Sequence, residues 1–134
     1  MSAVKIRAAL ETALNAMASP ISTSWENQAF VPPVATTPYQ IANVLLAQPS
    51  NLVYGSEHQE LGFMQIKLMY PVQIGTATVA ARAESLRSTF SRGSSFTASG
   101  VTVIISKTPE IMPGRIEESR YAVVVKIPFY SNIN

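Results

Sequence analysis

The sequence YAVVVKIPF, residues 121–129, is the strongest strand signal in the chain. Its odd-numbered residues, from Tyr121 to Phe129, are all large and apolar, and in an extended strand they share one face. The other face carries Ala122, Val124 and Lys126 and is only partly apolar. Because a strand with one strongly apolar face must be covered by other elements, the pattern predicts a strand within a sheet whose one face is buried.

A second long strand is expected at Leu61–Tyr70, where Met64, Ile66 and Leu68 alternate with more polar residues and Pro71 ends the run. Tyr39–Ala47 is apolar enough to be buried on much of both faces. Three shorter strands are also expected, the last two joined by a turn near Ser99-Gly100: Ser22–Asn27, Ser95–Thr97 and Val101–Ser106.

The first of two helices is expected at Ala3–Ala18, with Ser2 as its N-cap and Ser19-Pro20 as its stop. Helical spacing places four large apolar side chains on one side of it: Ile6, Leu10, Leu14 and Met17.

The second helix is expected at Thr76–Arg92, followed by Gly93 as the residue just past its C-terminal cap. Its apolar stripe is Val79, Ala83, Leu86 and Phe90. Its charged residues are expected to face solvent: Arg82, Glu84, Arg87 and Arg92.

Three connections complete the chain: a Pro-rich connector at Ala29–Pro33, a long hairpin connection at Gln48–Gln59, and a loop at Thr108–Glu118. The element order α-β-β-β-α-β-β-β predicts a single α+β domain over residues 1–134. Its mostly antiparallel sheet is covered on one face by two amphipathic helices. The opposite face is semi-apolar, which favours association of the chain with another protein surface. It is expected to carry Phe63, Met69, Ile104, Val124 and Tyr130.

Composition removes most catalytic and metal-binding chemistry. Charged residues make up 13% of the 134, about half the ~25% of a typical soluble domain, and ten Lys and Arg against eight Glu leave a net charge of +2. The chain has no Cys, no Asp and one His. These absences exclude a disulfide framework, a Ser-His-Asp triad, an EF-hand loop and a zinc site with two His or Cys ligands. Composition therefore favours a packing or assembly role.

No segment has the ~18–20 consecutive apolar residues of a membrane-spanning helix. The opening residues 2–7, SAVKIR, mix charged and apolar side chains and lack the core and cleavage site of a signal peptide. We expect a protein made and kept in a reducing cytoplasm.

The one His lies in a polar stretch with two carboxylates. His58, Glu57 and Glu60 offer the side chains of a metal or acid–base cluster, but neighbouring residues on an extended loop point apart, so a solvated loop tip is the favoured interpretation. Glu117 and Glu118 sit near two arginines and are expected to form a charged loop that discourages edge pairing.

Three other features are candidates for contact with a partner: the arginines of the second helix, the single Trp and one Met. Arg82, Arg87 and Arg92 recur every five residues, a step that turns ~140° on a helix, so they form no phosphate-tracking stripe. Trp25 is expected to be a core residue rather than an interface anchor, and Met112, in the last long loop, is the better candidate for an interface.

Nine short phrases, in order and spacing, make the chain resemble the tail-terminator-like proteins of long-tailed bacteriophages. The resemblance covers nearly the whole chain and consists of packing and turn residues. The phrases are Ile6–Glu11, Trp25–Asn27, Phe30–Pro33, Pro38-Tyr39, Ala47–Pro49, Gly62–Ile66, Tyr70-Pro71, Ala80–Glu84 and Val125–Phe129.

The resemblance implies a structural virion protein at the neck end of the tail, assembled in the host cytoplasm. Proteins of this family act as a homo-hexameric ring. The ring sits on the tail tube protein, stops its polymerisation, and presents its other surface to the head-completion or neck protein. DNA passes through the lumen without sequence-specific binding. No catalytic residue, metal or cofactor is expected. Partner contacts are expected in two loops, at Tyr54, His58 and Glu60 in the first and at Met112, Arg115 and Arg120 in the second.

Other functions remain open at this point. One is a small-molecule-binding α+β module that dimerises through its sheet, although no polar groups converge in an apolar setting. Another is a different small neck protein or a tail-tube subunit. A third is an enzyme that uses Glu with Tyr or Lys, and this one has the least support.

Overall fold

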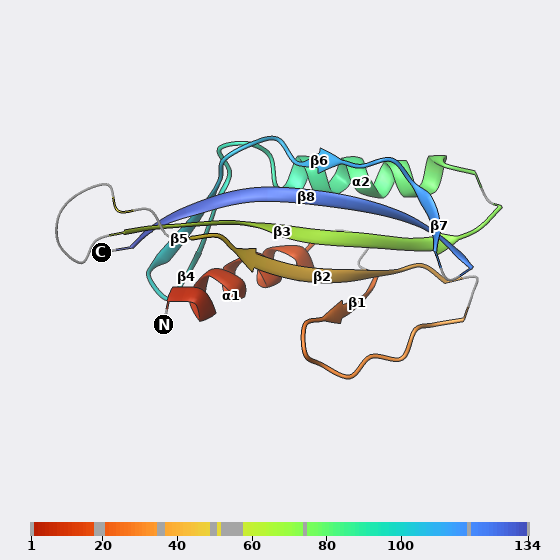
Figure 1. Cartoon of the computed structure of the whole chain (residues 1–134), viewed down its shortest axis with the longest axis horizontal. Helices are drawn as coiled ribbons and strands as arrows, with labels where there is room; N and C mark the ends of the chain where they lie inside the picture. Colours follow the sequence, from red (N-terminus) through yellow and green to blue (C-terminus); the bar gives the residue numbers. More distant parts are fainter. Residues whose placement is uncertain are drawn as a thin grey trace.

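Two long strands run through the whole molecule and form its centre. The computed structural model describes residues 2–17, 21–34, 37–48, 51, 58–73, 75–117 and 119–133. β3 (His58–Pro71) and β8 (Arg120–Ile133) pair antiparallel over their full length, from His58 opposite Ile133 to Pro71 opposite Arg120 (Figure 1). These are the two strands that alternation indicated most strongly, and each extends beyond its predicted bounds.

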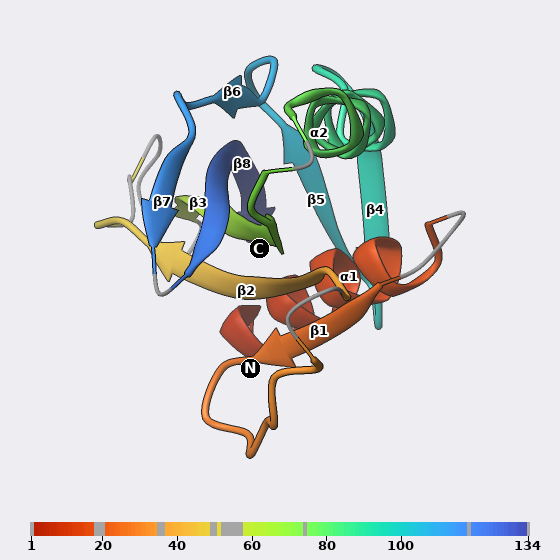
Figure 2. The same ribbon diagram turned by 90° about the vertical axis from the view of Figure 1, so that its right-hand side faces the viewer.

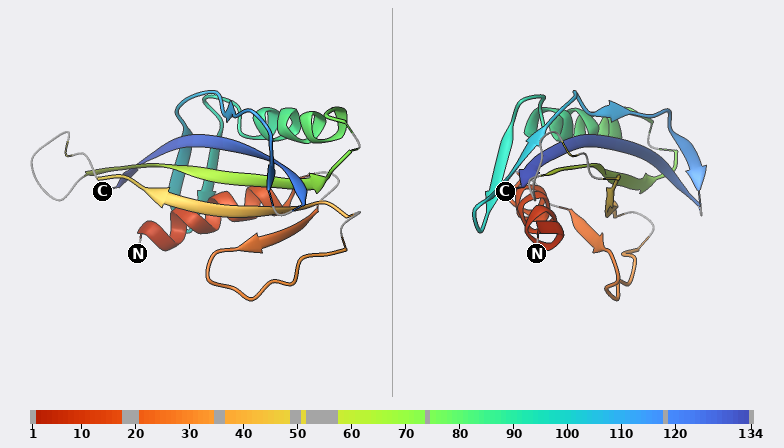
Figure 3. Two further views of the ribbon diagram at one scale, coloured as in Figure 1. Left: turned by 45° about the vertical axis from the view of Figure 1, so that its right-hand side comes forward. Right: turned by 60° about the vertical axis from the view of Figure 1, so that its left-hand side comes forward.

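The remaining strands extend the sheet on both sides. β2 (Tyr39–Leu46) pairs antiparallel with β3, and β1 (Ser22–Trp25) adds a parallel edge strand outside it. On the other side, β5 (Val101–Ile105) pairs with β8 and with β4 (Ser95–Ala98), giving the order β1-β2-β3-β8-β5-β4. β4 and β5 cross the long strands steeply, so the sheet curls (Figures 2 and 3).

The predicted loop at Thr108–Glu118 contains two short strands, so the predicted element order is wrong after the second helix. β6 (Glu110–Ile111) and β7 (Arg115–Glu117) both pair antiparallel with β8, and five strands rather than three follow that helix. Together with β5 they line one edge of β8 as an interrupted strand. Pro109 and Pro113 flank β6 and cannot donate to a ladder, which explains the interruptions.

Both helices contribute to one core on the same face of the sheet (Figure 3). α1 (Ser2–Asn15) begins at Ser2 itself, one residue before the predicted start, and Ser19-Pro20 lies outside the described residues. The predicted apolar residues of both helices are buried. The core also contains alternating residues of the two long strands: Met64, Ile66, Leu68, Tyr70, Val123, Val125, Ile127 and Phe129.

The second helix is shorter than predicted. α2 (Ala77–Thr89) is capped at Phe90, so Gly93 is not the residue just past the cap. Gly93 has a φ of 87° and donates its N–H to the carbonyl of Ile105, so it shapes the turn into β4. Arg82, expected to be solvated, is instead 7% exposed.

The opposite face of the sheet is partly covered by the chain itself. Tyr39, Met69 and Ala122 form a second small cluster there, packed against Phe30 and Ile41. Phe30 belongs to the connector between β1 and β2, and its ring lies 5.4 Å from that of Tyr39. The semi-apolar face is therefore closed at one end by the Pro-rich connector.

No helix among the described residues is long and apolar enough to cross a membrane.

Candidate interaction surfaces

Arg120 fastens the Pro-rich connector to the sheet. Its guanidinium donates hydrogen bonds to the carbonyl oxygens of Thr37 (2.7 Å), Pro33 (2.7 Å) and Val34 (3.0 Å), and it lies 4.7 Å from the centre of the Tyr39 ring. The residue is 7% exposed. Arg120 therefore affects any partner contact through the shape of the connector rather than through a free guanidinium.

The other residues proposed for the second loop lie along the edge of β8. Met112 is half-buried and donates its backbone N–H to the carbonyl of Val124. Arg115 starts β7, and its side chain is 70% exposed. Between them Gly114 lies against the ring of Tyr121, so that a Cβ at this position would collide with the ring.

A row of charges crosses the outer face near this edge. The Lys67 ammonium donates to the Glu117 carboxylate at 2.9 Å, and Arg115 lies 3.6 Å from the same group. The hydrogen bond from Lys67 holds the pKa of Glu117 below its usual value, helped by the charges of Lys67 and Arg115. Further along, the Lys126 ammonium lies 5.4 Å from the centre of the Phe63 ring.

The residues proposed for the first loop are at the end of the sheet where β3 begins and β8 ends. His58 is the first residue of β3, so its predicted place in a loop is wrong; its Nε2 lies 2.9 Å from Glu60 Oε1. Tyr54 and Glu57 lie outside the described residues. Within the parts of the chain that the structure describes, no three His, Cys, Asp or Glu side chains are grouped to hold a metal ion.

Arg82 takes part in a buried polar network that the sequence did not indicate. It donates to Gln40 Oε1 at 3.4 Å, and Gln40 in turn donates to Thr23 Oγ1 at 2.9 Å. Burial lowers the pKa of Arg82 and raises that of Tyr70, each partly offset by the other group. The sequence offers one indication of this burial: Arg82 immediately precedes Ala83, which belongs to the apolar stripe of α2.

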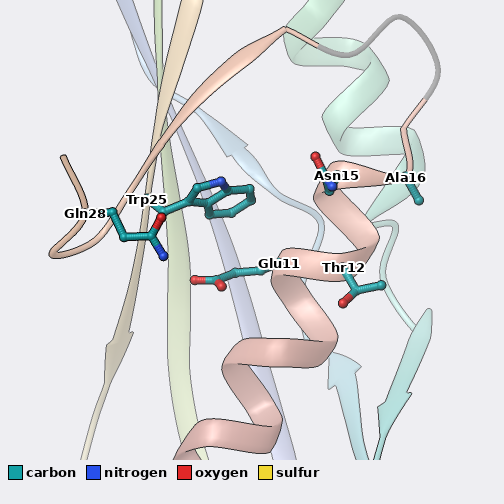
Figure 4. A pocket seen from close by; sticks show the side chains of 6 residues that line it. All are labelled: Glu11, Thr12, Asn15, Ala16, Trp25 and Gln28. Carbon is teal, nitrogen blue, oxygen red and sulfur yellow. The ribbon is translucent and has the colours of Figure 1, made fainter. Parts of the chain in front are cut away.

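A pocket of about 460 Å³ opens between α1 and the end of β1 (Figure 4). Trp25, which also packs against the core, forms one wall. Polar groups from both elements line the rest: Glu11, Thr12 and Asn15 from the helix side and Gln28 from the strand side.

Arg7 joins α1 to the sheet beside this pocket. It binds Glu26 at 2.7 Å, and it lies 3.7 Å from Glu11. Glu26 also accepts the N–H of Val44 at 2.6 Å, at a point of β2 beyond its pairing with β1. Two carboxylates therefore share one guanidinium, and Glu26 in addition accepts a hydrogen bond from a backbone N–H.

The two carboxylates are expected to affect stability with opposite pH dependence. Burial raises the pKa of Glu26, but the hydrogen bonds from Arg7 and Val44 outweigh it and hold the pKa below the usual value of a glutamate. Burial raises the pKa of Glu11 above that usual value, against the attraction of Arg7. A lowered carboxyl pKa stabilises the fold above the unfolded value and loses that contribution as pH falls. A raised one contributes at low pH and loses its contribution as pH rises.

Glu26→Gln should therefore destabilise the protein at pH 7 and much less at pH 3, whereas Glu11→Gln should be neutral or stabilising at pH 7. Chemical denaturation of the three proteins at both pH values measures this. Equal pH profiles for the two variants would contradict the assignment.

A second pocket of about 460 Å³ lies at the end of the molecule where β3 ends and β8 begins. Its walls are mainly apolar and combine the turn after β3 with the β7–β8 hairpin. They are lined by Pro71, Val72, Gln73, Gly75, Thr76, Ile116, Ser119 and Tyr121.

Beyond Ala42, where its pairing with β1 ends, β2 has no strand partner on that side; the backbone of Val44 is bound there by the side chains of Glu26 and Arg7. Leu45 and Leu46 follow and are 45% and 42% exposed. Exposed leucines on an unpaired strand edge favour contact with another chain.

Comparison with known proteins identifies the family of the chain. A family model described as phage tail terminator protein matches residues 5–129. The chain belongs to the phage tail terminator family. A solved structure known only by a sequence identifier matches with a TM-score of 0.80 and 23% identity, covering 100% of this chain and 97% of the other. That likeness supports the fold alone. A search of curated proteins finds no significant match.

Membership of the tail terminator family confirms the resemblance drawn from the sequence. Proteins of this family are structural components of the bacteriophage virion tail and interact with other tail or virion proteins.

Proposed function

We propose that this tail terminator family protein forms a closed ring that caps the tail tube, stops its polymerisation and offers its other surface to the head-completion protein. The match of residues 5–129 to the family carries the proposal. The chain acts as a single domain, residues 1–134, in a homo-hexamer assembled in the host cytoplasm. DNA passes through the lumen without sequence-specific contacts.

A ring needs two different surfaces on each copy, because a head-to-tail interface repeats around a closed circle. The curled sheet has one edge at β4 and another formed by β1 and by the part of β2 beyond Ala42. The exposed Leu45 and Leu46 on the second edge support its use in such an interface.

Contacts with tube and neck are proposed at opposite ends of the long strands. The β3–β8 register separates His58 and Glu60 from the start of β8 by nearly the length of a 14-residue strand, about 45 Å. At one end, the partner is contacted by Tyr54, His58 and Glu60. At the other end, the contacts are made by Met112, Arg115 and the connector that Arg120 holds. Such spacing suits a protein that touches different partners above and below its ring.

The test combines light scattering over a concentration series with negative-stain images, without and with purified tail tubes. We expect closed rings of about six copies, in solution or as caps on tube ends, and no filaments. Arg115→Glu should weaken capping or head joining, whereas Arg92→Glu, an exposed residue on the turn after α2, should not. Long tubes of the protein alone, or tubes that keep growing in its presence, would contradict the proposal.

A further inference from the structure

Three of the most exposed apolar side chains belong to the connector and to β7. Val31 and Val34, on the connector, are 88% and 72% exposed, and Ile116 on β7 is 73% exposed. The carbonyl of Val34 is bound by Arg120, and Ile116 pairs with the next residue, Tyr121. Large aliphatic side chains exposed to solvent are typical of contact surfaces, and here they occur at two separate places.

The conformation of the connector is restricted by its prolines and by contacts with the sheet. Pro32 and Pro33 fix their own φ angles and restrict each preceding residue to an extended conformation, so the sequence Val31-Pro32-Pro33 favours a short polyproline-type segment. Arg120 binds the carbonyls of Pro33, Val34 and Thr37, and Phe30 packs on Tyr39. A segment fixed before binding loses little conformational entropy when it docks.

The apolar pocket at the end of β3 has the chemistry of a site for such a segment. Tyr121 supplies an aromatic wall, Pro71, Val72 and Ile116 supply aliphatic ones, and Ser119 and Thr76 have hydroxyls that can donate to backbone carbonyls. Aromatic-lined grooves with a few donors are the usual receptors of extended Pro-rich segments. The pocket volume of about 460 Å³ accommodates small aliphatic side chains.

Pocket and connector lie on opposite faces of the sheet and do not meet within one chain. Tyr121 packs against the helix-covered core, whereas Tyr39, which contacts Arg120, belongs to the cluster on the other face. None of the connector residues that the structure describes lines the pocket, and Val31 and Val34 are exposed. Figures 1 and 2 show the connector projecting beyond β1 and β2, away from β7.

We propose that the Phe30–Val34 segment of one copy inserts Val31 and Val34 into the apolar pocket of the next copy. This inference rests on the proposed ring, for which it supplies a head-to-tail contact. Residues 27–38 contain no charged residue, and neither do the described residues that line the pocket. The contact is smaller than the ~800 Å² per partner of a stable interface, so it works together with the sheet edges.

Disulfide trapping tests the contact, because the natural chain has no cysteine. Val34→Cys and Ile116→Cys variants are made separately, mixed and mildly oxidised, and the heterodimer is followed on non-reducing gels. Both positions are exposed, so the fold should be retained. The matched control mixes Val4→Cys, an exposed valine of α1, with Ile116→Cys. Docking raises the local thiol concentration, and we expect the Val34–Ile116 heterodimer to form roughly tenfold faster than the control or more.

The outcomes separate this contact from the proposed function. The double variant Val34→Cys/Ile116→Cys should give a ladder of multimers that ends in a closed ring. Equal rates for the two mixtures, with the wild type still capping tubes, would overturn the contact and leave the ring standing. A fast heterodimer from a protein that fails to cap tubes would uphold the contact and overturn the proposed function. A trapped product between Val34 and the tube protein instead of a second copy would also overturn the contact.

Discussion

Replacing Arg120 with methionine is expected to lower the free energy of unfolding by about 2–3 kcal/mol. The substitution keeps an apolar stem but removes the hydrogen bonds to the carbonyls of Pro33, Val34 and Thr37, together with the contact to the Tyr39 ring. The loss is smaller than the sum of three charge-assisted bonds because the connector is near the surface, where water can replace the guanidinium. Thermal or denaturant unfolding measures the change.

Two further variants make the result specific. Arg120→Lys keeps the charge, but a single ammonium cannot span three carbonyls, so its stability should be intermediate. Arg115→Met removes an arginine that is 70% exposed and should change stability by no more than about 0.5 kcal/mol. Equal stability of Arg120→Met and Arg115→Met would show that the connector is held in place by other contacts.

Phe90→Ala is expected to have the largest effect, about 3–5 kcal/mol of lost stability. Phe90 caps α2, is fully buried, and packs its ring 5.2 Å from that of Phe96 on β4. Its removal leaves a cavity where the second helix meets the β4–β5 hairpin, in addition to the lost burial.

Phe63→Ala provides the matched control. Phe63 lies on the outer face, is half-buried, and has a ring contact with Lys126. Its removal should cost about 1 kcal/mol, since less apolar surface is lost and no closed cavity forms. If both phenylalanine variants unfolded at the same denaturant concentration, the assignment of Phe90 to the centre of the core would be wrong.

The errors in predicting burial and short strands from the sequence have one physical cause. Arg82 and Arg120 are charged, and charge predicts solvent exposure, yet both are buried because distant segments supply their acceptors. Gln40 is 42 positions from Arg82, and Thr37 is 83 positions from Arg120. No local pattern carries such information. Similarly, β6 and β7 are too short for alternation to reveal, and only the long edge of β8 makes them strands.

The candidate contact surfaces divide in the same way. The valines and prolines at 31–34 are visible in the sequence, but their exposure depends on Arg120 and on the position of Tyr39. The pocket joins Thr76 to Tyr121 across 45 positions and has no sequence signature. Tyr54 lies outside the described residues, so its role stays a prediction.

The sequence by itself determined the α+β class, the two long strands, the apolar sides of both helices and the tail terminator family. These depend on periodicity, on proline positions and on short packing phrases, all of which act over a few neighbouring residues. Only the tertiary structure decided which arginines are buried, where the connector lies and which surfaces remain open to another copy. Those features arise from contacts between segments far apart in the chain, and their geometry exists only once the sheet has curled around its core.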